Sequence, residues 1–250
     1  MKLEFNNIGG ATCVLRIDSI IKIAIDPALS PKGSKIIFKS FSSERIKEPV
    51  YKEEIFSDIN IWLLTHNHAD HIDELGLKMI DEKALVVMNK DCIELLKGKK
   101  AKVLEWGEIH CANIGEYEIK IVAIPAYHGN NFIMRNIVGK VNGYFIEINN
   151  KGEKKTIYFT SDTVYHKDVI KNINQEIDLM IANMGEVSSE KFGGPLTMSV
   201  SMLEKIEEGI KPKLIYPIHI NDYSHYDTRE KDLLNAGYTL IESGKWIVVV

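Results

Sequence analysis

The chain has 250 residues, of which 45% are hydrophobic, and a formal net charge of −4 from 31 basic and 35 acidic side chains. This length and apolar content predict a single domain over 1–250 with a substantial core, and they argue against intrinsic disorder. The nearly balanced charge disfavours nucleic acid and anionic membranes as partners. We therefore expect a small-molecule partner, and the sequence leaves a homo-oligomer open.

The cysteines and the N-terminal residues bear on the cellular compartment. Cys13, Cys92 and Cys111 are odd in number and widely spaced, which argues against a disulfide framework and fits a reducing compartment. Glu4 and Asn6 interrupt the N-terminus where a signal peptide needs an apolar run, and no stretch reaches the ~20 apolar residues of a membrane span. We expect a cytoplasmic protein with no membrane contact.

Short β-rich runs dominate the N-terminal half of the chain. Each is bounded by Gly, Pro, Asn or Asp, and strands are predicted at 13–17, 21–26, 59–65, 84–88, 102–106 and 118–124. Between two of these runs, Ile72, Leu75 and Met79 form one apolar stripe, which predicts a helix within 71–82. A second short helix is predicted over 91–99.

The second half of the chain repeats this alternation. Strands are predicted at 143–149, 155–160, 178–183, 213–220 and 245–250, and helices near 165–173, 198–209 and 227–236. Strands in both halves with helices between them predict an α/β fold in which sheet faces pack together and helices lie outside.

Two long segments lack a regular pattern and are predicted as irregular loops. The first, 27–57, is rich in Lys, Ser and Pro, and the second is the stretch at 129–143. Loops of this length within a compact domain are usually functional or mobile, so both are candidate covers over a substrate. The alternative is that each is a solvated surface excursion.

Three of the eight histidines fall within six positions, in the stretch LLTHNHADHIDELG at 63–76. They are His66, His68 and His71, and Asp70 lies among them. The stretch directly follows an apolar run, which predicts that the cluster begins where a buried strand ends. Imidazoles and a carboxylate at this spacing are typical of a metal site.

Three further side chains of the same kinds follow other predicted strands: His128, Asp162 and His219. Because ligand sites in α/β folds collect at the carboxyl ends of strands, we expect these side chains and the histidine cluster to share one edge of the core. The predicted metal ligands are His66, His68, Asp70, His71, His128, Asp162 and His219.

The spacing within the cluster indicates two ions rather than one. In an extended segment, side chains two residues apart point the same way, so His66 and His68 can hold one ion together. Asp70 and His71 lie where the chain turns toward the next helix, and they diverge toward a second ion. Two divalent ions about 3.5–4 Å apart form a clamp for hydrolysis. Imidazole and carboxylate suit Zn²⁺, with Mn²⁺ or Fe²⁺ as alternatives.

The motifs THNHADH, AYHG, SDT and PIH, in this order, resemble those of the metallo-β-lactamase superfamily of metal-dependent hydrolases. The resemblance runs through nearly the whole chain and implies a four-layer αββα sandwich with the site on one edge. The stretches GGPLTMS at 193–199 and PIHINDYSHYD at 217–227 are most similar to small bacterial hydrolases that group with ascorbate-6-phosphate lactonase.

The resemblance also implies how the ligands divide. It assigns His66, His68 and His128 to the first ion, Asp70, His71 and His219 to the second, and Asp162 to a bridge between them. Asp26 and Thr65 match positions that orient the ligands from behind, as metal-bound histidines require. A turn aspartate and a plain strand residue are the alternative readings of these two.

The leading predicted function is hydrolysis of a small ester, lactone or phosphoester metabolite by a hydroxide that the two metal ions activate. Asp70 is predicted to orient this nucleophile and to shuttle its proton, so its loss should lower turnover more than substrate binding.

Substrate contacts are predicted outside the ligand set. His225 is expected at the pocket mouth with Tyr223 beside it, as a catalytic contact to an oxyanion or leaving group, unless it is a plain surface residue. Arg135 is a candidate partner for an anionic substrate group, unless it is solvated. His110 and His166 match no ligand position and are predicted to be structural.

Four other functions are weighed against this one. A nuclease or RNA phosphodiesterase shares the metal site but usually needs a basic arm or an added domain. A mono-iron dioxygenase fits the ligand types, whereas di-iron versions resemble a pattern with glutamate at the position of His68. A metal-free binding protein need not keep seven polar ligands. A true β-lactamase is typically exported, and this chain shows no export signal.

Overall fold

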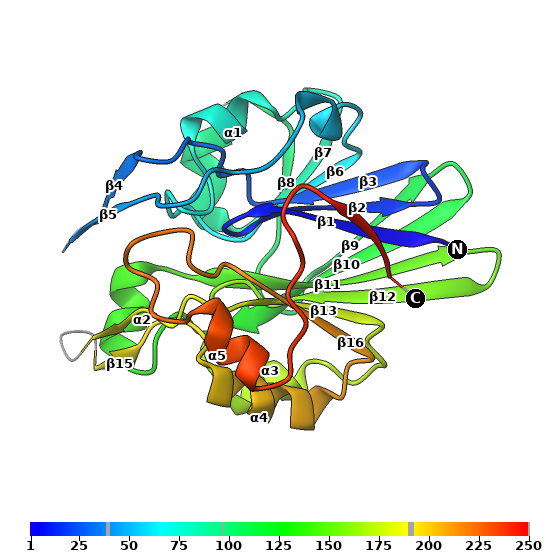
Figure 1. The fold of residues 1–250 in the computed structure, drawn as a ribbon. Helices are drawn as coiled ribbons and strands as arrows, with labels where there is room; N and C mark the ends of the chain where they lie inside the picture. Colours follow the sequence, from blue (N-terminus) through cyan, green and yellow to red (C-terminus); the bar gives the residue numbers. More distant parts are fainter. Residues whose placement is uncertain (39–40, 97, 190–192, 250) are drawn as a thin grey trace.

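Two β-sheets packed face to face form the centre of the molecule (Figure 1). The computed structural model describes residues 1–38, 41–96, 98–189 and 193–249. The first sheet has the order β17 (Trp246–Val249), β1 (Leu3–Gly9), β2 (Thr12–Ile17), β3 (Ile21–Ile25), β6 (Ile61–Leu64), β7 (Leu85–Met88) and β8 (Ala101–Val103). The second has the order β16 (Leu214–Ile218), β13 (Leu179–Asn183), β12 (Glu153–Phe159), β11 (Val141–Asn150), β10 (Tyr117–Ala126) and β9 (Ile109–Ile114).

Alternating side chains give the central strands of both sheets two buried faces. In β6, Ile61 and Leu63 enter the core between the sheets, whereas Trp62 packs into a second cluster on the outer face. In β12, Phe159 points into the central core and Tyr158 into a third cluster on the opposite outer face. This two-residue period explains why the strands read as nearly continuous apolar runs.

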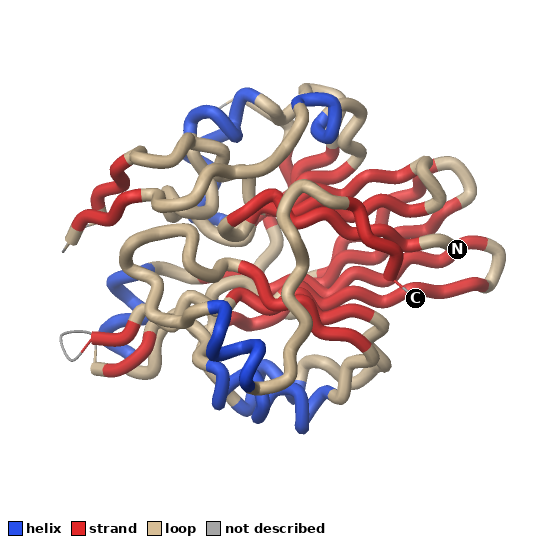
Figure 2. The backbone as a smooth tube through the Cα atoms, viewed as in Figure 1, coloured by secondary structure: helices blue, strands red, loops and turns tan. Residues whose placement is uncertain are grey.

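Helices cover the outer face of each sheet (Figure 2). The first sheet carries α1 (Glu74–Lys78) and the short 3₁₀ helices η1 (Glu53–Phe56) and η2 (Lys90–Leu96), and the second carries α3 (Lys167–Lys171), α4 (Val200–Ile210) and α5 (Glu230–Asn235). The four layers confirm the predicted αββα sandwich. No helix in the described ranges is long and apolar enough to cross a membrane.

Glycine and aspartate fix the position of α1 at the end of the histidine cluster. A Cβ added at Gly76 would lie 1.8 Å from the carbonyl oxygen of Pro27, so only glycine allows this approach. Asp73 caps the helix by accepting a hydrogen bond from the Gly76 N–H at 2.7 Å. Glu74 begins the helix, so both acidic residues lie at its N-terminal end.

The two segments predicted as irregular contain regular elements, so that prediction is wrong in part. The first contains a hairpin of β4 (Lys35–Ile37) and β5 (Ser42–Glu44) as well as η1. The second contains α2 (Phe132–Val138) and the start of β11. A second small hairpin, β14 (Ser188–Ser189) with β15 (Gly194–Pro195), lies on the same side of the molecule (Figure 1).

Candidate metal centre

Strands from both sheets end at one edge of the sandwich, remote from the two chain termini (Figure 1), and carry polar side chains there. In the first sheet, β3 leads into Asp26 and β6 leads into Thr65 and the histidine cluster. In the second sheet, β10, β12 and β16 lead into His128, Asp162 and His219. The structure thus brings all seven predicted ligands to one place, where they form three groups that share His66 and His71.

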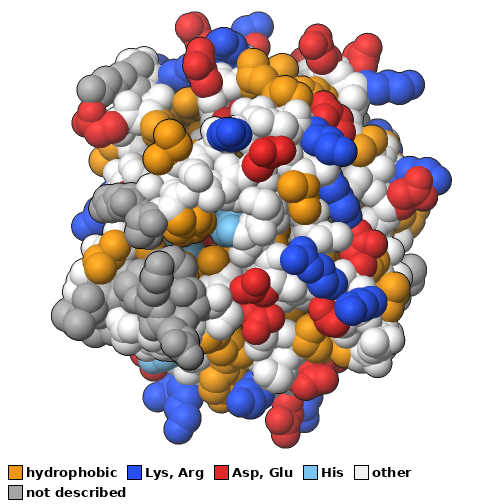
Figure 3. All heavy atoms as spheres, turned by 60° about the vertical axis from the view of Figure 1, so that its left-hand side comes forward, with side chains coloured by type: hydrophobic (Ala, Val, Ile, Leu, Met, Phe, Trp, Pro, Cys, Tyr) orange, Lys and Arg blue, Asp and Glu red, His pale blue; other side chains and the backbone are white. Residues whose placement is uncertain are grey.

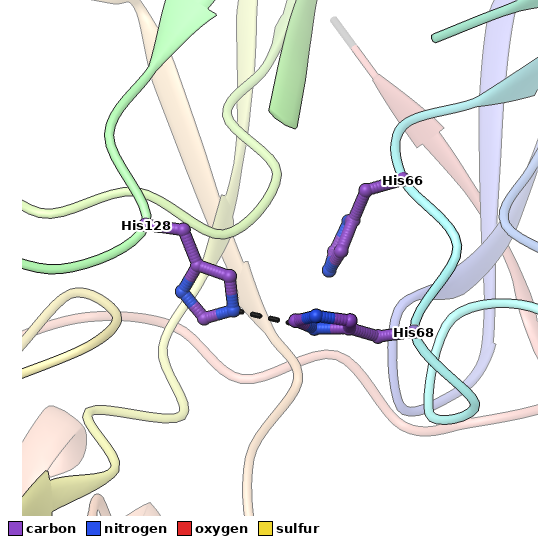
Figure 4. Close-up of side chains that lie close together, drawn as sticks. All are labelled: His66, His68 and His128. Atoms are coloured by element: carbon purple, nitrogen blue, oxygen red, sulfur yellow. Dashed lines mark hydrogen bonds between the residues drawn. The ribbon is translucent and has the colours of Figure 1, made fainter. Parts of the chain in front are cut away.

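Each group contains side chains whose ligand atoms lie within 4.8 Å of one another. The groups are His66, His68 and His128; His66, His71 and Asp162; and Asp70, His71 and His219. The first and third groups are the two ligand sets that the resemblance implies, and the second links them. Figure 4 shows the imidazoles of His66 and His68, from the loop after β6, converging with that of His128 from the loop after β10.

At three points where a strand ends, a residue with a left-handed backbone conformation turns the chain toward the centre. Asp26, Ser161 and His219 have φ values of 44°, 54° and 61°, which non-glycine residues rarely adopt. Such a conformation costs on the order of 1–3 kcal/mol per residue. The stability of the rest of the fold offsets this free-energy cost, which falls at the edge where the polar side chains meet.

His68 and His128 face each other through one ring nitrogen each, His68 Nδ1 and His128 Nε2, which lie 3.4 Å apart. The Nε2–H of His68 donates to the carbonyl oxygen of Val138 at 3.1 Å, and the Nδ1–H of His128 donates to that of Leu196 at 2.9 Å. When both imidazoles are neutral, these bonds leave a lone pair on each of the facing nitrogens, and a cation bound by both would remove the repulsion between them.

His66 and His71 are oriented from behind by the hydroxyl of Thr65 and the carboxylate of Asp26. The Thr65 hydroxyl donates to Asp26 Oδ2 at 2.6 Å and lies 3.0 Å from His66 Nδ1. Asp26 Oδ2 also accepts from His71 Nδ1 at 2.7 Å. Both imidazoles therefore present Nε2 to the centre, which is the supporting arrangement predicted for Asp26 and Thr65.

His219 and Asp70 are joined by the hydroxyl of Tyr226. The Nε2–H of His219 donates to the Tyr226 hydroxyl, which donates to Asp70 Oδ2 at 3.1 Å. This bond leaves His219 Nδ1 and Asp70 Oδ1 directed at the centre.

Asp162 lies between the two ligand sets. Its Oδ1 accepts from the amide of Asn183 at 3.0 Å and lies 3.2 Å from His71 Nε2 and 3.6 Å from His219 Nδ1. Its Oδ2 lies 3.8 Å from His128 Nε2. The carboxylate thus turns one oxygen toward each set, as the predicted bridging role requires.

Burial controls the protonation of most of these imidazoles. It lowers the pKa of His68 and of His219 to about 4, so both are neutral at pH 7 and able to bind a metal. Burial also acts to lower the pKa of His71, but the carboxylates of Asp162 and Asp26 outweigh it and hold this pKa well above its ordinary value. A divalent ion would displace the His71 proton when it binds.

The residues present fit two divalent ions. Among the described side chains, four buried atoms of the centre have no hydrogen-bond partner: His66 Nε2, Asp70 Oδ1, His71 Nε2 and His219 Nδ1. A buried polar atom without a partner costs about 1–3 kcal/mol, so four at one point indicate a missing ligand. Neutral imidazole and carboxylate form a donor set suited to zinc and other first-row metals.

A cavity of about 320 Å³ opens onto the centre (Figure 3). Its polar floor consists of His68, Asp70, His128, Asp162 and His225. Its walls are apolar and include Ile37, Phe38, Phe41, Ile137, Val138 and Leu196, from the β4–β5 hairpin, α2 and the segment after β15. The two segments predicted as substrate covers therefore both border the site.

Of the two side chains predicted near the pocket mouth, the structure places only His225 in the cavity. His225 lies in the cavity, with Nε2 3.6 Å from Asp70 Oδ2 and Nδ1 2.6 Å from the hydroxyl of Ser43. Tyr223 lies beside His225 as expected, with ring centroids 6.0 Å apart, but it is buried beneath the guanidinium of Arg45 and does not line the cavity. The ring that reaches the centre is Tyr226, which the sequence analysis missed.

Arg135 does not meet the expectation of an anion-binding residue. Its guanidinium donates to the carbonyl oxygens of Gly129 and Asn130 at 2.9 and 3.1 Å, and it stacks on Tyr127. These bonds fold the guanidinium onto its own loop, so it holds that loop instead of facing the cavity. His166 stacks on the same Tyr127 ring and accepts a hydrogen bond at the start of α3, which is a structural position.

Comparison with known families identifies the fold. A family model described as a beta-lactamase superfamily domain matches residues 22–220. The chain belongs to the metallo-β-lactamase superfamily. The match spans the strands that carry all seven predicted ligands, from β3 to the exit of β16.

Relatives within the metallo-β-lactamase superfamily are themselves named only by a broad activity. The chain is 28% identical over 210 residues to a UPF0173 metal-dependent hydrolase of Pyrococcus abyssi, covering 83% of this chain and 80% of the relative. It is 27% identical to one of Pyrococcus furiosus over 207 residues, covering 83% and 80%. The broad class predicted from the sequence, a metal-dependent hydrolase, agrees with these names.

Solved metallo-β-lactamase-type structures show the same fold over the whole chain. A possible metal-dependent hydrolase from Veillonella parvula superposes with a TM-score of 0.83 at 19% identity, covering 100% of both chains. An isothiocyanate hydrolase from Delia radicum gut bacteria superposes with a TM-score of 0.78 at 20% identity, covering 98% of each. At these identities the likeness concerns the fold alone.

Proposed function

We propose that the chain is a hydrolase that holds two divalent ions, zinc in the first place, and cleaves a small ester, lactone or phosphoester. The observation that carries the proposal is the arrangement of the five imidazoles in the centre. Protein groups hold one nitrogen of each: Thr65, Val138, Asp26, Leu196 and Tyr226. The other nitrogen of each faces one common point, and metal-binding histidines are typically oriented in this way by a hydrogen bond to their second nitrogen.

The ligands divide as the three groups suggest. His66, His68 and His128 would hold one ion, Asp70, His71 and His219 the other, and Asp162 would lie against both. When bound, such ions supply Lewis-acid activation of water and of a substrate oxygen.

Asp70 is the proposed proton acceptor. Burial acts to raise the pKa of its carboxyl, but His225, His71 and His219 outweigh it and hold this pKa well below its usual range. Asp70 is therefore a carboxylate at neutral pH. The Tyr226 hydroxyl fixes Oδ2, and Oδ1 faces the centre, so the same carboxylate can hold the second ion and orient the water beside it.

His225 is the proposed contact to the substrate. Its side chain is buried apart from 11% and lies on the cavity floor beside Asp70. The Ser43 hydroxyl holds Nδ1, so Nε2 faces the cavity and can donate to an oxygen of the substrate or the leaving group.

The test is hydrolysis of a substrate panel by the zinc-loaded protein. Lactones, phosphodiesters and thioesters are compared, with His66→Ala as the variant that removes one ligand. We expect zinc-dependent turnover of at least one class and its loss in His66→Ala, with circular dichroism showing that the variant is folded. Turnover that survives in His66→Ala, or no turnover by the zinc-loaded chain across the panel, would contradict the proposal.

A further inference from the structure

The walls of the cavity indicate which substrates it accepts. Part of its apolar lining, Phe38, Val138, Val187 and Leu196, belongs to a cluster beside the metal centre that also contains the buried Ile36, Tyr223 and Tyr226. This cluster joins the β4–β5 hairpin to Val187, which precedes β14, and to Leu196, which follows β15. This part of the wall is packed, whereas Ile37 and Ile137 are exposed side chains that also line the cavity.

Two aromatic rings form the part of the wall nearest to the reacting groups. Phe38 and Phe41 stack on each other with ring centroids 4.5 Å apart. The N–H of Phe38 donates to the carbonyl oxygen of Phe41 at 2.8 Å, which closes the hairpin between them. The hairpin therefore holds the two rings together as one stacked aromatic pair.

This aromatic pair lies directly against the site histidines. The Phe38 ring meets the His225 ring edge-on at 5.2 Å between centroids and the His68 ring at 5.9 Å. Phe41 lies 5.4 Å from His225. A substrate whose scissile group reaches His225 and Asp70 can place its next atoms against Phe38 and Phe41, because both rings line the same cavity and contact His225.

The charges of the residues that line the cavity also favour an uncharged substrate. Among the described residues that line the cavity, none is Lys or Arg. The nearby Arg135 is bonded to the carbonyl oxygens of its own loop. Against the apolar side chains described in this wall, a phosphate or carboxylate on the substrate would lose water without a charged partner among them, whereas an apolar group gains from the same burial.

We infer that the substrate is a small uncharged molecule whose scissile group lies over the metal centre and whose flat apolar or aromatic part lies against Phe38 and Phe41. The inference rests on the proposed hydrolase function. It selects neutral esters and lactones within the proposed class and excludes phosphorylated sugars, which are the substrates that the lactonase-like resemblance would suggest.

Binding of unreactive lactams tests the inference without turnover. Isothermal titration of the zinc-loaded protein compares γ-phenyl-γ-butyrolactam with the same molecule carrying a para-carboxylate. We expect the neutral lactam to bind at least ~10-fold more tightly, because only the carboxylate has to be desolvated against the apolar wall. Equal binding, tighter binding of the carboxylate, or no detectable binding of either at millimolar concentration would overturn the inference.

Variants of the two rings assign the preference to the wall. Phe38→Ala and Phe41→Ala should each weaken binding of the neutral lactam ~10-fold and leave the carboxylate unaffected, while Phe38→Leu should retain part of the affinity. Ile20→Ala is the control, since Ile20 is an apolar side chain, 60% exposed, in the turn between β2 and β3 and outside the cavity. Unchanged discrimination in both alanine variants would contradict the assignment to these rings.

Hydrolysis of the matching γ-phenyl-γ-butyrolactone, measured in parallel, separates the two proposals. Lactam discrimination in a chain that hydrolyses no member of the panel would contradict the hydrolase function and leave the pocket preference standing. Zinc-dependent turnover together with equal binding of both lactams would contradict the pocket preference and leave the hydrolase function standing.

Discussion

Two aspartates at opposite ends of the same pair of strands show how the functional edge differs from the structural one. Asp178 precedes β13 and accepts hydrogen bonds from the Thr156 N–H and from Lys213, each at 2.8 Å. Asp162 follows β12 and has an amide bond from Asn183, with histidine nitrogens 3.2 to 3.8 Å away. The protein itself satisfies Asp178, whereas the neighbours of Asp162 at the functional edge include described atoms without a hydrogen-bond partner, among them Asp70 Oδ1 and His219 Nδ1.

The comparison predicts opposite responses to the same substitution. Removing a charge from the structural edge should lower stability and spare metal binding. Removing a charge from the functional edge should weaken metal binding and affect the stability of the metal-free fold less, because several polar atoms there have no partner without metal.

The largest effect is expected for Asp162→Asn. The amide keeps the size of the side chain but loses the negative charge shared between the two ligand sets, so less than the full zinc content should be retained. The value of kcat/KM should fall by more than the ~10–100-fold typical of residues that only orient ligands. Zinc per chain is measured by mass spectrometry of the metal, together with hydrolysis. Full zinc content in this variant would contradict the predicted difference between the functional and the structural edge.

The next effect is expected for Asp26→Asn. Asp26 accepts from His71 Nδ1 and from Thr65, so an amide there loosens the orientation of two ligands without removing one. Zinc affinity, measured by competition with a chelator, should fall ~10–100-fold. Glu4→Gln provides a matched control, since Glu4 is a buried carboxylate paired with Arg16 far from the centre. An unchanged affinity in Asp26→Asn would show that Asp26 is only a turn residue.

A smaller effect, on stability alone, is expected for Asp178→Asn. The ion pair with Lys213 is partly exposed and contributes little, so most of the loss should come from the weakened bond to the Thr156 N–H. The free energy of unfolding in urea should fall by ~1–2 kcal/mol, with zinc content unchanged. Zinc loss in this variant would mean that the two edges are not independent.

The smallest effect is a difference in acid stability. Burial acts to raise the pKa of Asp178, but bonds from Lys213 and Thr156 outweigh it and hold this pKa below 3.8. A carboxyl with a lowered folded-state pKa contributes stability above 3.8 that is lost as pH falls through the folded-state pKa. Between pH 5 and 2, the metal-free wild type should therefore lose stability more steeply than Asp178→Asn. Parallel curves would contradict this.

Much of the centre could be predicted from the sequence because its ligands directly follow apolar runs. His66, His68, Asp70 and His71 lie within six residues, and His128 and His219 come two residues and one residue after β10 and β16. Since strand direction and the two-residue period fix where such side chains emerge, their convergence follows from the fold class.

Residues on the surrounding loops could not be predicted in the same way. Tyr223 and Tyr226 lie in one short segment, and nothing in the sequence tells which ring turns inward to Asp70 and which packs under Arg45. The position of Arg135 could not be predicted for the same reason, because its bonds to Gly129 and Asn130 depend on a helix, α2, that was not predicted. Flanking Gly and Asn and the β-branched residues within α2 favour a loop prediction.

The central claim is that seven side chains from two sheets hold two metal ions at one edge. Anomalous diffraction at the zinc absorption edge, from crystals of the zinc-reconstituted chain, tests it most directly. The account predicts two peaks, one bounded by His66, His68 and His128 and the other by Asp70, His71 and His219, with Asp162 between them. A single peak, or peaks away from these side chains, would contradict it.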